Sequence, residues 1–179
     1  RLGGGVISMG AVEGSSVAKG ETLSDTARTV AQYADVIVIR HPKMGSAKEV
    51  ADAVEIPVIN AGDGAGQHPT QALLDLYTIR KELGSLKNLT ISLVGDLKNG
   101  RTVHALVEVL SHFEARFYFV SPGLLRMPEE VTAPLKEKGC RVIETEDISL
   151  AASKSDLIYM TRIQRERFAD LSEYEKVKG

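Results

Sequence analysis

Four side chains that can bind anions follow four different predicted strands in this sequence. Arg40, His68, Arg101 and Arg162 each lie at the end of a short apolar run or in the turn after it. Strand ends ordinarily favour small turn residues, so solvated loop charges do not explain all four together. Guanidinium forks bind carboxylates and phosphates, and donors fixed in a dry cleft stabilise developing negative charge. We therefore predict a cleft for small polyanions, in which Arg40 and His68 polarise a carbonyl group.

The apolar pattern supplies the elements that would position these side chains. Short β-branched runs predict strands at residues 35–40, 56–60, 89–94, 116–120 and 156–161. Apolar spacings of three and four predict helices at 22–33, 46–54, 69–83, 102–113 and 129–138. This alternation predicts an α/β protein with two doubly wound, parallel-sheet lobes, residues 1–69 and 70–179, linked by the helix at 69–83. In such sheets ligands bind outside the carboxyl ends of the strands, where the four side chains fall.

Two glycine-rich turns resemble nucleotide motifs without matching them. Residues 62–66 lack the third glycine of a dinucleotide fingerprint, because Gln67 stands at that position. Residues 95–102 have the strand, glycine spacing, threonine and helix of a phosphate-binding P-loop, but Arg101 replaces its lysine. Both turns indicate an anion at a helix N-terminus, and a tight turn without ligand is the alternative at each.

Composition excludes several classes of protein. The 179-residue chain has a formal net charge of −2, which disfavours a general nucleic-acid binder. Its single cysteine, Cys140, excludes an internal disulfide framework, and its four histidines lack zinc-ligand spacing, so we predict no metal site and no cofactor. The apolar runs are strand-sized, and the first residues lack the apolar segment of a signal peptide, so we expect a cytoplasmic protein.

The motifs resemble one family closely, the aspartate carbamoyltransferase catalytic chains. The stretch from Asn60 to Asp75, NAGDGAGQHPTQALLD, looks like the central signature of that family. Four further segments match in order and approximate spacing: residues 19–22 (KGET), 40–42 (RHP), 94–104 (VGDLKNGRTVH) and 160–164 (MTRIQ). The resemblance covers essentially the whole chain, and the last two segments indicate the aspartate rather than the ornithine branch.

The resemblance implies transfer of the carbamoyl group from carbamoyl phosphate to the amine of L-aspartate, an early step of pyrimidine synthesis. It implies a carbamoyl-phosphate lobe, partly missing here, and an aspartate lobe. By matching position, Lys19, Arg40 and His68 would be catalytic. Carbamoyl phosphate would contact Ser15, Arg40, His68 and Gln71, and aspartate would contact Lys19, Arg101, Arg162 and Gln164.

The resemblance also implies partners. The loop that carries Ser15 and Lys19 enters a neighbouring subunit's active site in the family, so a homotrimer with shared sites is expected, and a regulatory chain is an open question. The family's Ser-Thr-Arg-Thr-Arg phosphate loop and its His-Pro-Leu-Pro turn are absent, which we interpret as truncation of a longer protein. Asn99 stands where some members have an aromatic residue.

Three alternatives stay open on sequence alone. A relative could use another amino acceptor, such as ornithine. A non-catalytic, carbamoyltransferase-like scaffold would also account for the missing phosphate loop. A nucleotide-hydrolysing P-loop protein ranks third.

Overall fold

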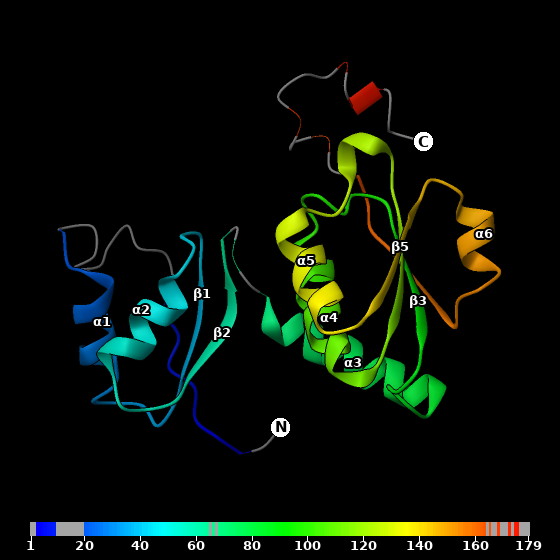
Figure 1. Ribbon diagram of the computed structural model, residues 1–179. Coiled ribbons are helices and arrows are strands. Elements are labelled where there is room, and N and C mark those ends of the chain that lie inside the picture. Colours follow the sequence, from blue (N-terminus) through cyan, green and yellow to red (C-terminus); the bar gives the residue numbers. More distant parts are fainter. Residues whose placement is uncertain are drawn as a thin grey trace. The chain divides into compact units, whose positions relative to one another are not determined.

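The structure is a computed structural model that describes residues 3–9, 20–64, 66, 68–163, 165, 168, 172, 174 and 175. The chain divides into two compact units, Arg1–Gly66 and Gln67–Gly179, called here the N-terminal and the C-terminal unit (Figure 1). In the part of the chain that is described, no helix combines the length and the apolar character needed to cross a bilayer.

The N-terminal unit is built from two helices and a parallel two-stranded sheet. Its elements are α1 (Leu23–Val30), β1 (Ile37–His41), α2 (Ser46–Ala53) and β2 (Val58–Asp63). Thr22 begins α1, because its hydroxyl accepts a hydrogen bond from the Asp25 amide at 3.1 Å. Helix α2 packs on both strands, and α1 packs on α2. The strand pairing shifts between Ile39 and His41, so Arg40 lies at an irregularity near the carboxyl end of β1.

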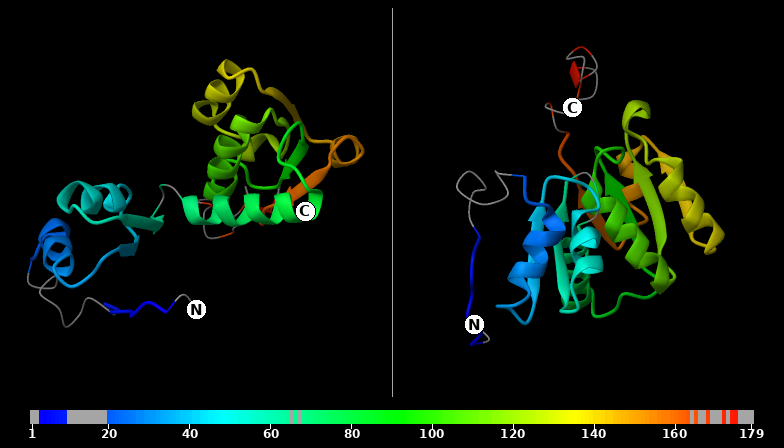
Figure 2. Two further views of the ribbon diagram at one scale, coloured as in Figure 1. Left: turned by 90° about the horizontal axis from the view of Figure 1, so that it is seen from below. Right: turned by 90° about the vertical axis from the view of Figure 1, so that its left-hand side faces the viewer.

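The C-terminal unit is a doubly wound, all-parallel sheet with the strand order β5-β4-β3-β6. Helices α3, α4 and α5 lie on one face of the sheet and α6 lies on the other (Figures 1 and 2). The chain therefore returns from the edge strand β5 across the α6 face to pair β6 with β3. The elements are α3 (Pro69–Leu83), β3 (Thr90–Val94), α4 (Arg101–Leu110), β4 (Arg116–Val120), α5 (Glu129–Glu137), β5 (Arg141–Thr145), α6 (Ile148–Ala152) and β6 (Leu157–Met160).

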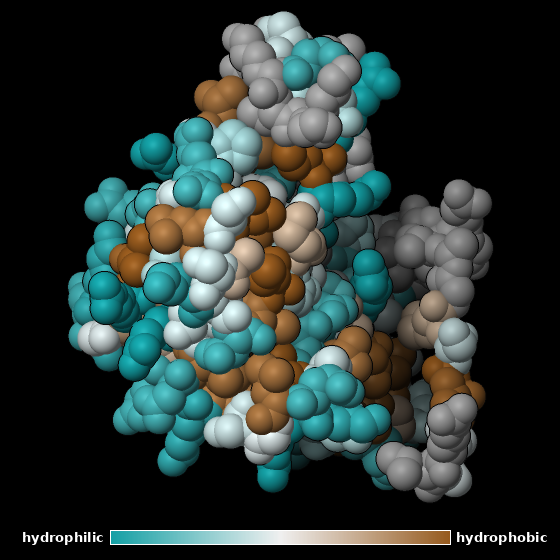
Figure 3. Space-filling view, turned by 90° about the vertical axis from the view of Figure 1, so that its right-hand side faces the viewer, coloured by the Kyte–Doolittle hydropathy of each residue, from teal (hydrophilic) through white to brown (hydrophobic). Residues whose placement is uncertain are grey.

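The main core lies between this sheet and its three-helix face. Strands β3 and β4 bury Ile91, Leu93, Phe117 and Phe119 there, and the two phenylalanine rings stack with centroids 5.9 Å apart. The alternate residues of each strand face α6, which is only five residues long. Several large apolar side chains of α6 and β6 stay exposed, namely Ile148, Leu150, Ile158 and Met160. Figure 3 shows brown, hydrophobic areas among the teal ones on the side of the molecule that it presents.

The structure confirms the predicted α/β class with parallel sheets in two lobes. The helix at Pro69–Leu83 and the strand at Arg116–Val120 have the predicted bounds. The helix predicted to reach residue 113 ends at Leu110, and a 3₁₀ turn continues to Phe113. Strand β5 and helix α6 were not predicted. In β5 two apolar residues stand between Arg141 and Glu144, and both of these charged residues are exposed, so the run is too short to show an apolar period.

Candidate active site

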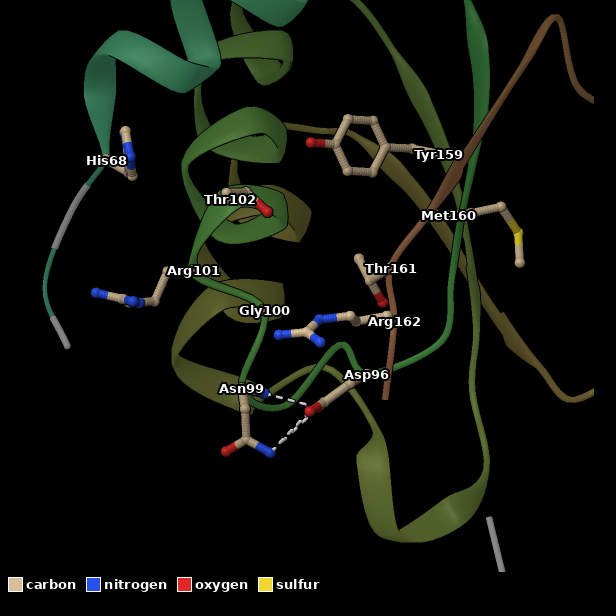
Figure 4. A pocket seen from close by; sticks show the side chains of 10 residues that line it. All are labelled: His68, Asp96, Asn99, Gly100, Arg101, Thr102, Tyr159, Met160, Thr161 and Arg162. Atoms are coloured by element: carbon tan, nitrogen blue, oxygen red, sulfur yellow. Dashed lines mark hydrogen bonds between the residues drawn. The ribbon is translucent and has the colours of Figure 1, made fainter. Parts of the chain in front are cut away.

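A cavity of about 270 Å³ opens at the carboxyl ends of β3 and β6 in the C-terminal unit (Figure 4). Three separate segments line it: His68 before α3, residues 96 and 99–102 in the turn after β3 and the first residues of α4, and residues 159–162 at the end of β6 and directly after it. Strand β3 leads into α4 on the three-helix face of the sheet, whereas β6 is reached from α6 on the other face, and the cavity lies where these two neighbouring strands end. This is the usual ligand position in an open α/β sheet.

The turn after β3 is held by a buried carboxylate. Asp96 is 2% exposed and accepts hydrogen bonds from the Asn99 amide at 2.9 Å and from the Asn99 side chain at 3.1 Å. Gly100 ends the turn, and a Cβ on it would lie 2.6 Å from the Asp96 carbonyl oxygen. His104 closes the first turn of α4 through its Nε2, which lies 2.7 Å from the Leu97 carbonyl oxygen. These contacts fix the start of α4 and therefore the backbone of Arg101.

The ends of β3 and β6 are in close contact. The Thr161 amide and hydroxyl both donate to the Val94 carbonyl oxygen, at 2.8 and 3.0 Å. Gly95 has a φ of +110°, and a Cβ there would collide with the Thr161 carbonyl. Only glycine adopts this conformation at low cost and lets the two strands approach so closely. The contact delivers Arg162 to the cavity directly after β6.

Cationic groups dominate the lining. In Figure 4 the guanidinium of Arg162 reaches in beside Gly100, while Arg101 extends on the side where His68 lies. The single carboxylate of the lining, that of Asp96, is occupied by Asn99. Two guanidinium forks and an imidazole around a cavity of this size suit a small, multiply charged anion.

A second polar network links α3 to β6 at this cavity. The Asp75 carboxylate accepts from the Gln71 amide nitrogen at 2.9 Å and from the Tyr159 hydroxyl at 3.0 Å. In Figure 4 the phenol of Tyr159 points across the cavity toward Thr102, and Met160 points away from it. Burial raises the pKa of Tyr159, and the charge and hydrogen bond of Asp75 raise this pKa further, while a hydrogen bond with Thr102 acts in the opposite direction. Tyr159 therefore stays protonated at neutral pH and donates to Asp75.

This pKa predicts an alkaline instability of the C-terminal unit. The pKa is raised in the folded state, so the stabilisation is complete below the unfolded-state value of about 10 and is lost as the pH rises through the folded-state value. We expect the free energy of unfolding of Tyr159→Phe to fall less than that of the wild type between about pH 9 and pH 11. Urea titrations at each pH measure this, with Tyr118→Phe in β4 as the control. Equal pH slopes for Tyr159→Phe and the wild type would contradict the prediction.

The structure brings together three of the four side chains that the sequence singled out at strand ends. His68, Arg101 and Arg162 line the same cavity, and Gln71 lies in the first turn of α3. Arg40 is exposed near the end of β1 in the N-terminal unit. The remaining predicted site residues, Ser15, Lys19 and Gln164, lie outside the described residues.

Sequence reasoning missed Tyr159 and Asp75 as members of the site. Asp75 follows Gln71 by four residues on a predicted helix, a spacing at which side chains form hydrogen bonds, so this half of the network was detectable. Tyr159 falls within a predicted strand, and its position in the sequence does not mark it as a site residue. Among the described residues, no group of three or more His, Cys, Asp or Glu side chains is arranged to hold a metal ion.

Residues 1–81 match the family model of the aspartate/ornithine carbamoyltransferase carbamoyl-P binding domain, and residues 87–178 match that of the Asp/Orn binding domain. The aspartate carbamoyltransferase catalytic subunits of Thermococcus gammatolerans and Thermococcus kodakarensis are 56% and 57% identical over all 179 residues. The chain spans 58% of the length of each of these relatives.

Solved structures agree. The catalytic subunit of M. jannaschii aspartate transcarbamoylase is 52% identical with a TM-score of 0.90, and the match covers 99% of this chain and 58% of that one. Aspartate transcarbamoylase from Trypanosoma cruzi, in complex with carbamoyl phosphate and aspartate, is 45% identical with a TM-score of 0.86, covering 98% of this chain and 57% of that one. Two family models that together take in nearly the whole sequence, and a fold shared with these enzymes, establish that the chain belongs to the aspartate/ornithine carbamoyltransferase family.

Proposed function

We propose that this protein transfers the carbamoyl group of carbamoyl phosphate to the amine of L-aspartate, giving N-carbamoyl-L-aspartate and phosphate. The observation that carries the proposal is the cavity between β3 and β6, where His68, Arg101 and Arg162 come together from three segments. The relatives at 56% and 57% identity bear the name aspartate carbamoyltransferase catalytic subunit, which supports the same reaction. The nucleotide-hydrolysing alternative finds no support, since both matching family models describe carbamoyltransferases.

In the proposed reaction the aspartate amine attacks the carbamoyl carbon, and a C–N bond forms. The carbonyl oxygen takes up negative charge in a tetrahedral intermediate. The C–O bond to phosphate then breaks, phosphate leaves with the electron pair, and the former amine loses a proton. No covalent bond to the protein is needed, so the rate depends on orientation of the two substrates and on stabilisation of the oxyanion.

The roles of the residues follow from this chemistry. Arg101 and Arg162 would hold the aspartate carboxylates, because each guanidinium can form two parallel hydrogen bonds with a carboxylate. His68 and Arg40 would donate to the carbonyl oxygen as it becomes negative. The resemblance assigns carbamoyl phosphate to Gln71 and Ser15 as well, aspartate to Gln164, and both substrates to Lys19.

The proposal extends to organisation. We assign residues 1–69 to the carbamoyl-phosphate domain and residues 70–179 to the aspartate domain, with the helix Pro69–Leu83 as the link. A homotrimer with shared active sites, a cytoplasmic location and a place in pyrimidine synthesis complete the proposal, and they rest on the resemblance. A separate regulatory chain is left open.

The decisive experiment supplies carbamoyl phosphate and aspartate to the full-length protein and measures carbamoyl aspartate and phosphate. We expect both products in equal amounts, and none of the carbamoylated product with ornithine, whose side-chain ammonium would be repelled by Arg162. Product with ornithine alone would favour another amino acceptor. If no product forms, titration with N-(phosphonacetyl)-L-aspartic acid separates an inactive enzyme, which binds it, from a scaffold, which does not. If the full-length protein carbamoylates neither aspartate nor ornithine, the proposal is overturned.

A further inference from the structure

Asp75 connects two elements that carry proposed substrate contacts. It lies in α3, one turn after Gln71, and its two oxygens have different partners: Oδ1 accepts from Gln71 at 2.9 Å, and Oδ2 accepts from Tyr159 at 3.0 Å. Asp75, Gln71 and Tyr159 are all half-buried, and 84 residues separate Asp75 from Tyr159 along the chain. The carboxylate therefore joins the start of α3 to the end of β6.

The first of these bonds determines the orientation of the Gln71 amide. An ionised carboxylate can only accept hydrogen bonds, so the group of Gln71 that faces Asp75 must be the NH₂ and not the carbonyl. The carbonyl oxygen Oε1 then points to the other side. In the described part of the chain it has no hydrogen-bond partner, and it is an acceptor available to a ligand. Without Asp75 the amide can rotate and present either end.

An acceptor is what the amide group of a carbamoyl compound requires at this place. Its NH₂ has two donors, while the arginine and histidine side chains of the proposed site supply donors for phosphate, carboxylate and carbonyl oxygens. An oriented glutamine oxygen supplies the complementary group. It would also favour a carbamoyl substrate over an acetyl analogue, which has no N–H to donate.

The second hydrogen bond, from the Tyr159 hydroxyl to Asp75, links the orientation of the Gln71 amide to strand β6. Tyr159 lies in β6 three residues before Arg162, and the intervening Thr161 is hydrogen-bonded to the end of β3. Its hydroxyl fixes the carboxylate of Asp75, because a carboxylate held at both oxygens cannot rotate freely. The orientation of the Gln71 amide therefore depends on the position of β6, which carries Tyr159.

We propose that Asp75, braced by Tyr159, is a positioning residue that fixes the amide of Gln71 so that its carbonyl oxygen accepts from the NH₂ of carbamoyl phosphate. This inference rests on the proposed function. In this inference Asp75 does not contact the substrate. Its substitution should affect the binding of carbamoyl phosphate and not that of aspartate.

The test is a double-mutant cycle in the full-length protein. We expect Asp75→Ala to raise KM for carbamoyl phosphate about tenfold, the usual effect of losing one hydrogen bond of this kind, with a much smaller change in KM for aspartate. In a Gln71→Ala background the same substitution should produce no further rise. Asp75→Asn keeps an acceptor for Gln71 and should restore KM to within about threefold of the wild type. Glu82→Gln, an exposed position of the same helix, is the matched control.

Three results would overturn the inference while the wild type remains active. These are equal effects of Asp75→Ala with and without Gln71, an unchanged KM for carbamoyl phosphate, or a failure of Asp75→Asn to rescue. If Asp75→Ala does not fold, Tyr159→Phe replaces it in the cycle, with an expected rise in KM of about threefold that disappears in the Gln71→Ala background. A wild type without carbamoyl transfer would instead refute the proposed function, and the inference with it.

Discussion

Arg162→Ala is expected to lower kcat/KM for aspartate by a factor of about 30 to 5,000 in the full-length protein, which corresponds to about 2–5 kcal/mol. Arg162 reaches into the cavity from the end of β6, opposite the turn that carries Arg101. Removing its guanidinium leaves a substrate carboxylate without its paired donors in a confined site. Initial rates at saturating carbamoyl phosphate and varied aspartate measure the loss.

Three further variants sharpen this experiment. Arg162→Lys should recover only a small part of the activity, because an ammonium is a point charge and does not reproduce two parallel hydrogen bonds. Arg101→Ala should weaken the handling of aspartate in the same direction. Arg116→Ala is the control, because this exposed arginine begins β4 and lies at the amino ends of the strands, whereas the cavity lies at their carboxyl ends. Aspartate kinetics of Arg162→Ala that equal those of the wild type would rule out its assigned role.

Gly95→Ala is expected to lower the free energy of unfolding of the C-terminal unit by about 2–5 kcal/mol. Two effects add up at this position. The φ of +110° is strained for any residue with a Cβ, and the new methyl group would meet the Thr161 carbonyl and hydroxyl. The strand ends can relieve the collision only by moving apart, which breaks the bonds between Thr161 and Val94. Chemical unfolding of the full-length protein measures the loss.

Gly139→Ala separates the two effects. Gly139 has a φ of +79°, but a Cβ there would meet nothing within 4 Å. Its substitution should therefore cost only the conformational strain, about 1 kcal/mol. The difference between the two variants reports the close approach of β3 and β6. Equal losses at Gly95 and Gly139 would show that the strand contact contributes nothing to stability.

Much of the fold was predictable because the residues that begin, end or fill an element favour the same structure that its packing in the protein requires. Helix α3 has proline at its first position and glycine after its end, and Gly84 does adopt the left-handed conformation that ends a helix. After Arg116, strand β4 is a run of aromatic and β-branched residues, of which Phe117, Phe119 and Val120 are buried. Such elements carry their boundaries in their own residues.

The elements that were missed depend on their neighbours. Strand β5 is an edge strand in which Arg141 stands opposite Arg116 of β4 and Glu144 is exposed, so its pairing with β4 rather than its own sequence makes it a strand. Helix α6 has five residues and begins where Asp147 accepts from the Leu150 amide. A segment of that length shows no helical period.

The candidate site also contains residues that the sequence predicts and residues that only the structure reveals. The rule that ligands bind at the carboxyl ends of parallel strands predicts that Arg40, His68, Arg101 and Arg162 share a cleft, and three of them, His68, Arg101 and Arg162, do line one cavity. The bond between Asp75 and Tyr159 joins residues far apart in the sequence, and no local pattern predicts it. Residue types and strand ends thus indicate which groups meet a ligand, whereas the groups that orient them are visible only in three dimensions.

The return of the chain to pair β6 with β3 has a consequence for biosynthesis. Thr90 at the start of β3 binds the Asp156 carboxylate 66 residues later, and the cavity has one wall from each of these strands. A ribosome that has released the chain only as far as β5 has released three adjacent strands and half of the crevice. We therefore expect the cavity to be completed only when β6 joins the sheet, because the pairing of β6 with β3 is a long-range contact and such contacts form slowly.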